Sequence, residues 1–194
     1  MLCRRMFLKS SALFAATFLG AKSALAKLTD ADHLANQLSE DKLKLPEGKL
    51  SLYNINNRER LTVTYRNSLG EYCQDALHSL NWILRCHNTN ETTEMDLRVL
   101  EYLNRVVNCF GGDHEVHIIS GYRSPAYNRM LRSHSHGVAK DSYHMKGRAI
   151  DFCIPGVALD KLRKTALALA AGGVGYYPHN GWVHIDSGHF RTWG

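Results

Sequence analysis

The sequence predicts an α+β domain in which helices pack on a small, largely antiparallel sheet. Alternating apolar residues after position 48 indicate paired strands, helical spacing of apolar residues then follows twice, and short strands and helices complete the chain. The chain has 194 residues, of which 44% are hydrophobic and 22% charged. This length and composition suffice for one buried core, so we expect a single folded domain.

The first 26 residues are predicted to be an export signal. They contain a basic start (Arg4-Arg5-Met6-Phe7-Leu8-Lys9), an apolar run at 10–21 and a small-x-small cleavage site at 24–26. The paired arginines resemble a twin-arginine signal, which implies the twin-arginine translocase as a partner during export and the periplasm as destination. A membrane anchor is the alternative, but the uncharged run covers about a dozen residues where a spanning helix needs roughly 20, so no stable membrane insertion is expected.

Cleavage would leave a polar lead-in at 27–47 and the folded domain at 48–194. The formal charge of +6 would fall to +2, because residues 1–26 hold four basic residues and no acid. So small a charge argues against a nucleic-acid partner. Four cysteines would remain, none in a CxxC pair, and they either form disulfides or stay as buried free thiols. Cys73 and Cys109 fall on the apolar faces of predicted helices, which suits free thiols.

The N-terminal elements follow from residue periodicity. Residues 49–66 alternate around Asn56-Asn57-Arg58-Glu59, which predicts a β-hairpin. Two amphipathic helices should follow, at about 71–87 and 97–107. Their apolar positions are Leu77, Leu80, Ile83 and Leu84 in the first helix and Leu97, Leu100, Leu103 and Val107 in the second.

The C-terminal elements mix short strands with helices. Residues 117–120 predict a strand, and Ser124-Pro125 can cap and start a helix that runs towards Arg132. Residues 149–154 predict a strand, and 159–171 a helix that Gly172-Gly173 ends. A last strand is expected at 182–186.

Two of these strands carry polar side chains on the face opposite their apolar residues. Asp151 lies opposite the face of Ile150 and Phe152, and in the last strand His184 alternates with Val183 and Ile185. If the two strands pair, Asp151 and His184 converge, and the loop that enters the first strand supplies His144.

Two imidazoles and a carboxylate form a three-ligand set of the kind that catalytic zinc uses, with water in the fourth position. Zinc lowers the pKa of that water to roughly 7 and polarises a carbonyl, so hydrolysis is the natural reaction. Spacing alone does not establish the site, since the chain has eleven histidines.

Several motifs occur in order along the chain and together resemble one family. They are Ser120-Gly121-Tyr122-Arg123-Ser124-Pro125, Ser-x-His-x-x-Gly-x-Ala-x-Asp at 142–151, Gly172-Gly173-Val174-Gly175-Tyr176-Tyr177-Pro178, Val183-His184-Ile185-Asp186 and Arg191-Thr192-Trp193. They resemble the twin-arginine-exported murein endopeptidases, formerly a domain of unknown function, which are related to the zinc D-Ala-D-Ala carboxypeptidases and the hedgehog signalling domain.

The resemblance implies the fold of those relatives and one zinc ion per chain, bound by His144, Asp151 and His184. It implies peptidoglycan stem peptides as substrate and an L,D-endopeptidase that cuts cross-links between two diaminopimelate residues. The alternatives are a D,D-carboxypeptidase or D,D-endopeptidase, because bond choice depends on the shape of the cleft, and a non-catalytic wall-binding module that keeps the zinc fold.

The catalytic groups are less well defined. Arg123 matches a substrate-orienting arginine of the wider superfamily, with a structural ion pair as the alternative. Related carboxypeptidases carry an acid three residues before the last histidine ligand, where this chain has Gly181. Asp186 is therefore the candidate general base, or else it hydrogen-bonds and orients a ligand.

Several other histidines and aromatic residues stay outside the predicted catalytic set. They are His134 and His136 in a polar loop, His179 and His189 as rim residues, and Tyr176, Tyr177 and Trp182 as cleft or packing aromatics.

Overall fold

The computed structural model describes residues 46–135 and 137–194. The predicted signal at 1–26 and all but the last two residues of the predicted lead-in lie outside them. No helix among the described residues is long and apolar enough to cross a membrane.

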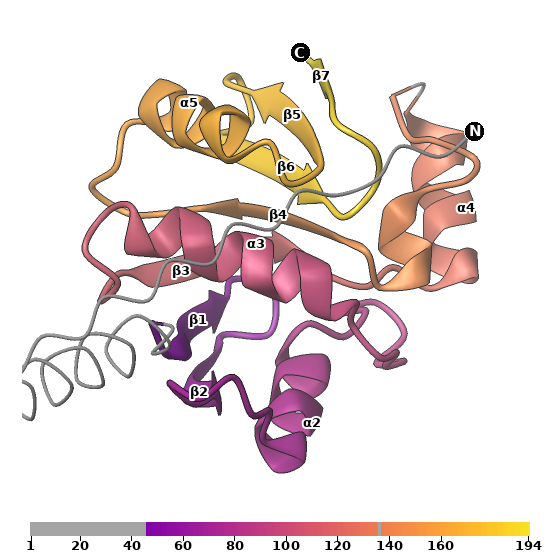
Figure 1. Ribbon diagram of the computed structural model, residues 1–194. Helices are drawn as coiled ribbons and strands as arrows, with labels where there is room; N and C mark the ends of the chain where they lie inside the picture. Colours follow the sequence, from indigo (N-terminus) through magenta and orange to yellow (C-terminus); the bar gives the residue numbers. More distant parts are fainter. Residues whose placement is uncertain (1–45, 136) are drawn as a thin grey trace, which may run out of the picture. The chain divides into compact units, whose positions relative to one another are not determined.

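The domain is built on one seven-stranded sheet (Figure 1). The strands are β1 (Gly48–Asn54), β2 (Glu59–Arg66), β3 (Glu115–Ser120), β4 (Ala149–Cys153), β5 (Gly173–Tyr177), β6 (Trp182–Asp186) and β7 (Arg191–Trp193). Their order across the sheet is β2-β1-β3-β4-β6-β5-β7.

The sheet is mixed, which corrects the expectation of a largely antiparallel one. β1 pairs with β3, and β5 with β7, in parallel, while the other neighbouring strands run antiparallel. A parallel pair needs a crossover connection instead of a tight turn. The long segment between β1 and β3, which contains β2 and two helices, provides such a connection. The α+β class itself is confirmed, since the domain combines a mixed sheet with helices.

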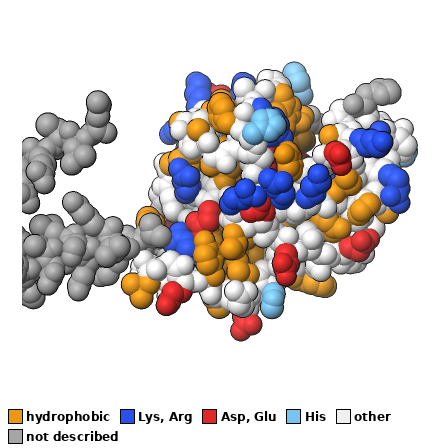
Figure 2. Space-filling model, turned by 45° about the vertical axis from the view of Figure 1, so that its right-hand side comes forward, with side chains coloured by type: hydrophobic (Ala, Val, Ile, Leu, Met, Phe, Trp, Pro, Cys, Tyr) orange, Lys and Arg blue, Asp and Glu red, His pale blue; other side chains and the backbone are white. Residues whose placement is uncertain are grey.

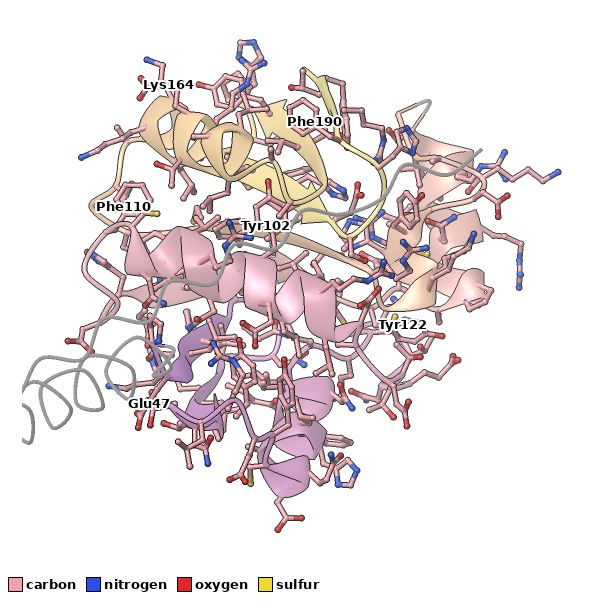
Figure 3. The ribbon with its side chains drawn as sticks, in the orientation of Figure 1. Glu47, Tyr102, Phe110, Tyr122, Lys164 and Phe190 are labelled. Carbon is pink, nitrogen blue, oxygen red and sulfur yellow. The ribbon has the colours of Figure 1, made fainter. Side chains whose placement is uncertain are left out.

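Four α-helices and one 3-10 helix surround the sheet in the described part of the chain. They are α2 (Gln74–Ile83), α3 (Leu97–Asn108), α4 (Pro125–His134), η1 (Tyr143–Lys146) and α5 (Leu159–Leu169). In Figure 1, α3 and α5 lie in front of the sheet, α2 packs below on β2, and α4 lies at the right-hand end. Tyr102 of α3 reaches α5, where its hydroxyl donates to the Ala166 carbonyl at 2.8 Å (Figure 3).

The core lies between the sheet and the helices α3 and α5. Alternate residues of the central strands point into it, and each buried Leu, Ile or Phe stabilises the fold by about 1.5–3 kcal/mol. The strand residues concerned are Leu50, Leu52, Val116, Ile118, Ile150, Phe152, Val174, Val183 and Ile185. The predicted alternation is therefore confirmed, and it leaves Asp151 and His184 on the opposite face.

The end of α5 differs from the prediction. The helix ends at Leu169, and its C-cap residue Ala170 takes a left-handed φ of 47°. Gly173 already begins β5, a strand that the sequence did not predict. A side chain at Gly172 would overlap the Asp186 carbonyl oxygen, and one at Gly173 would meet Arg191 and the Asp186 carboxylate. These glycines therefore permit β5 to approach β6 closely.

The four cysteines of the described residues are free thiols. Cys86 is buried, but Cys73 and Cys109 are exposed, because they cap α2 and α3 and do not lie on apolar helix faces as expected. On the surface, Lys and Arg side chains form a row across the face drawn in Figure 2, with acidic side chains next to several of them.

Candidate metal centre

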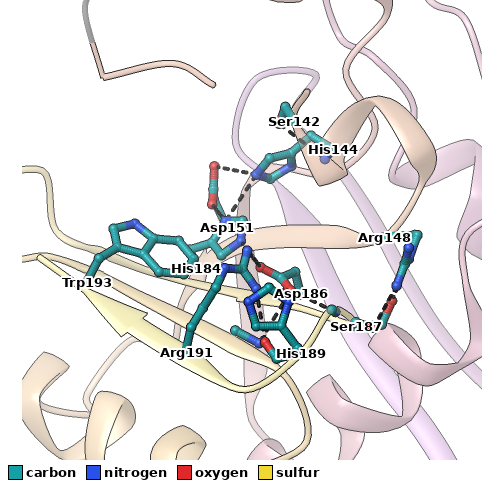
Figure 4. A network of polar contacts seen from close by, with 12 residues as sticks. Ser142, His144, Arg148, Asp151, His184, Asp186, Ser187, His189, Arg191 and Trp193 are labelled. Atoms are coloured by element: carbon teal, nitrogen blue, oxygen red, sulfur yellow. Dashed lines mark hydrogen bonds and ion pairs between the residues drawn. The ribbon is translucent and has the colours of Figure 1, made fainter. Parts of the chain in front are cut away.

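The structure brings together the three side chains of the predicted metal site (Figure 4). The antiparallel register of β4 and β6 places Asp151 directly opposite His184. His144 comes from η1, whose first turn is capped by the Ser142 hydroxyl, which accepts from the His144 N–H. One ligand atom from each residue lies within 4.8 Å of the other two.

The turn after β3 holds His144 from two sides. The Gly121 carbonyl accepts a hydrogen bond from His144 Nδ1 at 2.7 Å, and the Arg123 N–H donates to the His144 carbonyl at 3.1 Å. A side chain at Gly121 would overlap the Leu84 carbonyl, so only glycine fits there. This is the structural role of the Ser120–Arg123 motif.

The outer ring nitrogen of each histidine faces a group that can only accept. His144 Nδ1 faces the Gly121 carbonyl, and His184 Nε2 lies 3.0 Å from Asp186 Oδ2. These nitrogens therefore carry the protons of the neutral rings, which leaves His144 Nε2 and His184 Nδ1 as lone-pair donors.

The inner atoms of the cluster are all acceptors in close contact. His184 Nδ1 lies 2.8 Å from Asp151 Oδ1 and 3.2 Å from His144 Nε2, which is in turn 3.2 Å from Asp151 Oδ2. The three residues are at most 8% exposed, so water cannot readily separate them. Lone pairs facing one another need a shared cation or an added proton. The set of two imidazoles and a carboxylate fits a zinc ion.

Burial and charge act against each other in this cluster. Burial alone would raise the pKa of Asp151, but His144 and His184 outweigh it and hold the pKa below its ordinary value. Burial lowers the pKa of His144. Burial also acts to lower the pKa of His184, but hydrogen bonds with Asp151 and Asp186 outweigh it and raise that pKa. The carboxylate is thus ionised and His144 neutral, the states that a metal ligand needs.

Asp186 is buried next to the cluster, and both of its carboxylate oxygens accept hydrogen bonds. It is 0% exposed and accepts two hydrogen bonds from Arg191, at 2.9 and 2.6 Å, and backbone hydrogen bonds from Gly173 and Gly188. It also faces His184 Nε2 and does not line the cleft described below. Of the two roles expected for Asp186, this geometry favours the orientation of His184 over proton transfer.

Arg123 contacts the cluster directly. Its Nη2 donates to Asp151 Oδ2 at 2.8 Å and its Nε to the Ser120 hydroxyl at 3.1 Å. The side chain also lines the cleft. Arg123 therefore forms an ion pair with Asp151, the structural role that the sequence left open. Because it also lines the cleft, a substrate can reach it.

His144, Asp151 and His184 line a cleft of about 590 Å³. One wall comes from α4 and the segment after it, with Leu131, Val138 and Ala139. A second part of the lining, the aromatic wall, consists of Tyr177, Trp182 and Trp193.

The aromatic wall is held rigidly. Tyr177 and Trp182 stack with their ring centroids 3.8 Å apart, and Trp193 Nε1 donates to the Tyr177 hydroxyl at 2.8 Å. Tyr177 and Trp182 thus line the cleft, whereas Tyr176 lies outside it under the Arg163 guanidinium. The sequence assigns no role to Trp193, because nothing in it places β7 beside β5.

None of the other histidines considered for the site lines the cleft within the described residues. His134 is exposed at the end of α4, and His179 and His189 are exposed beside β6 without lining the cleft; His136 is outside the described residues. Gly181 takes φ +80° in the turn between β5 and β6. The sequence did not single out Asp141, an exposed carboxylate that does line the cleft.

Comparison with known proteins identifies relatives along most of the chain. A family model described as peptidoglycan L,D-endopeptidase MepK matches residues 45–193. The peptidoglycan L,D-endopeptidase MepK of Escherichia coli (strain K12) is 43% identical over 144 residues, which are 74% of this chain and 79% of that protein. The probable peptidoglycan L,D-endopeptidase MepK of Haemophilus influenzae is 41% identical over 145 residues, 74% of this chain and 77% of that protein. No solved structure matches with significance.

Proposed function

Because the chain belongs to the family of MepK peptidoglycan L,D-endopeptidases, we propose that it hydrolyses peptide cross-links between two diaminopimelate residues of the cell wall, with zinc as its metal. The observation that carries the proposal is the buried cluster of His144, Asp151 and His184, whose lone pairs face one another along a cleft. A cation is the group that such a cluster fits.

In the proposed site these three side chains hold one zinc ion per chain. Zinc held there would act as a Lewis acid towards the scissile carbonyl and the attacking water. The Gly121 carbonyl and the Asp186 carboxylate hold the outer protons of the two rings, so that each imidazole offers its lone pair to the metal.

Arg123 has two tasks in this proposal. Its Nη2 fixes the orientation of the Asp151 carboxylate through the 2.8 Å contact. Since its guanidinium also lines the cleft, its remaining N–H groups can bind a substrate carboxylate or support charge that develops on the carbonyl oxygen. Diaminopimelate cross-links carry carboxylates, which suits a guanidinium in this place.

The cleft walls suit an extended peptide. The stacked Tyr177 and Trp182 offer a flat apolar surface in a cleft that Leu131 and Val138 also line, and Asn180 adds an amide to the lining. Aromatic groups bury area at low conformational cost, so a wall of this kind can fix a peptide against the metal.

We further propose the domain limits and the export route. Residues 1–26 are the twin-arginine signal, 27–47 the lead-in and 48–194 the zinc peptidase domain, which acts in the periplasm. The support is the signal's composition and the cell-wall substrate in the names of the relatives.

The deciding experiment digests purified peptidoglycan with the mature protein, with and without zinc, and identifies the products by mass. We expect zinc-dependent loss of the diaminopimelate-diaminopimelate cross-link. His144→Ala should abolish it, and His134→Ala, the same change at an exposed position outside the cleft, should leave it intact. Loss of a D,D cross-link instead would assign a D,D-endopeptidase. No cleavage by folded, zinc-loaded protein would favour the wall-binding module.

A further inference from the structure

A second hollow of about 330 Å³ lies apart from the cleft, at the C-terminal part of α2 and the segment before α3. It shares no lining residue with the cleft. In Figure 1, α2 lies at the lower edge of the domain, whereas β5 and β6 lie near the top. We call it the Trp82 groove, and it is lined by His78, Asn81, Trp82, Thr92, Thr93 and Glu94.

The indole ring of Trp82 is exposed yet held in one orientation. The residue is 54% exposed, although a ring of this size is usually covered. The Arg85 guanidinium stacks on the ring with its central carbon 4.1 Å from the ring centroid. Arg85 is itself only 6% exposed and donates two hydrogen bonds to Glu59, at 2.7 and 2.8 Å, and one to Asn90. A rigid support of this kind presents the ring as a flat platform.

The described groups around the platform can form hydrogen bonds, and none of them is a Lys or Arg. Asn81 Oδ1 accepts from the Met95 N–H at 3.0 Å, and the Asn81 NH₂ group makes no hydrogen bond within the described residues. Thr92 and Thr93 add hydroxyls, and Glu94 forms no ion pair among the described residues. No Lys or Arg lines the groove, and Glu59 neutralises Arg85 behind the ring.

This combination matches a sugar more closely than a peptide or an anion. A pyranose has an apolar C–H face that can cover an aromatic ring, and an edge of hydroxyl and acetamido groups that pair with amide, hydroxyl and carboxylate groups. An anionic partner would need a cation, and no Lys or Arg is among the described residues that line the groove.

The groove packs against the 3-10 helix that carries His144. The Asp96 N–H donates to the Gly147 carbonyl at 2.8 Å, and a side chain at Gly147 would meet Thr93 and the Glu94 carbonyl. Gly147 ends η1, which carries His144. The element that supplies a proposed ligand therefore packs directly against the groove.

We propose that the Trp82 groove binds the N-acetylated glycan strand of peptidoglycan while the stem peptide occupies the cleft. The inference rests on the proposed function, since it takes peptidoglycan as substrate. Binding energy from a remote part of a substrate can hold its reacting part in place. Removal of the platform should therefore slow the digestion of intact peptidoglycan and leave the hydrolysis of sugar-free peptides unchanged.

The test uses two probes: uncharged strands of N-acetylglucosamine, which lack the carboxylate that peptide-free N-acetylmuramic acid exposes, and a sugar-free cross-linked peptide dimer. With ¹⁵N-labelled protein, the strands should shift the indole N–H signal of Trp82, assigned by its loss in Trp82→Phe, and leave those of Trp182 and Trp193 in place. Trp82→Ala should weaken strand binding about tenfold, as truncation of a central aromatic contact does.

The matched control is Leu69→Ala, which removes an exposed apolar side chain, 71% exposed, outside both hollows. It should bind strands like the wild type, and Trp82→Phe should retain most of the binding. Absence of strand binding by the wild type, or an equal loss in Leu69→Ala, would overturn the inference. Failure of the wild type to cut the peptide dimer would instead refute the proposed function, because that probe does not need the groove.

Discussion

The substitution Asp186→Asn separates the two roles considered for this residue. In the structure Asp186 Oδ1 accepts from the Gly188 N–H and from Arg191 Nη1, while Oδ2 faces His184 Nε2 and Arg191 Nη2. An asparagine keeps only one oxygen. If that oxygen stays with Gly188, the NH₂ group of the asparagine faces two other hydrogen-bond donors, one on Arg191 and one on His184.

The least costly relief moves the His184 proton from Nε2 to Nδ1, the atom that faces Asp151. The ring would then lose the lone pair that it offers to the metal. Loss of an orienting partner of this kind weakens metal binding about 10- to 100-fold. The free energy of unfolding should fall by about 1–3 kcal/mol, because a buried donor is left without an acceptor.

The assay is a competition titration against a chromophoric zinc chelator, followed by hydrolysis of the cross-linked peptide dimer at saturating zinc. The control is Asp141→Asn, the same change at an exposed carboxylate of the cleft, which should keep the zinc affinity of the wild type. Asp186→Asn protein with normal zinc affinity but no hydrolysis at saturation would refute the reasoning and assign Asp186 as the general base.

Three further predictions concern packing, pH and export. Gly173→Ala should lower the free energy of unfolding by about 1–3 kcal/mol in chemical denaturation, because no space exists for a side chain between β5 and the buried carboxylate; Gly137→Ala, in open surroundings, should change it little. Burial acts to raise the pKa of Asp96, but hydrogen bonds from neighbouring groups outweigh it and hold the pKa at about 2, so stability present above pH 4 should be lost as the pH falls through 2. Asp96→Asn should reduce this loss of stability at low pH. If the free energy of unfolding of the variant depended on pH in the same way as that of the wild type, the prediction would be wrong. Replacing Arg4 and Arg5 by lysine should keep the protein in the cytoplasm in a fractionation assay, and normal periplasmic delivery would count against the twin-arginine route.

Local periodicity was enough to predict most of the elements. The hairpin at 49–66 and the helix at 97–107 appear within two residues of their predicted ends, and α4 begins at the predicted Ser124-Pro125 cap. Each of these signals depends on neighbours a few residues apart in the chain, and such neighbours interact in the same way in any fold. The alternation in 149–154 and 182–186 likewise determined which face each strand buries.

The elements that the sequence missed are those defined by distant partners. β5 is rich in glycine because Gly173 and Gly175 must approach side chains of β7, Arg191 and Trp193. In sequence such glycines resemble the end of a helix, which is why α5 was predicted to continue to them. The parallel pairing of β1 with β3 also has no local signal.

The sequence by itself determined the kind of chemistry and the three residues proposed to carry it, since ligand types, strand faces and ordered motifs are all properties of the chain. Only the tertiary structure decided that Asp151 lies directly across from His184, that Asp186 is hydrogen-bonded to Arg191 and does not line the cleft, and that Trp82 stands exposed on Arg85. Each of these depends on strand register or on contacts between residues far apart in the chain. Such contacts form only when the whole core packs, and no short stretch of sequence records them.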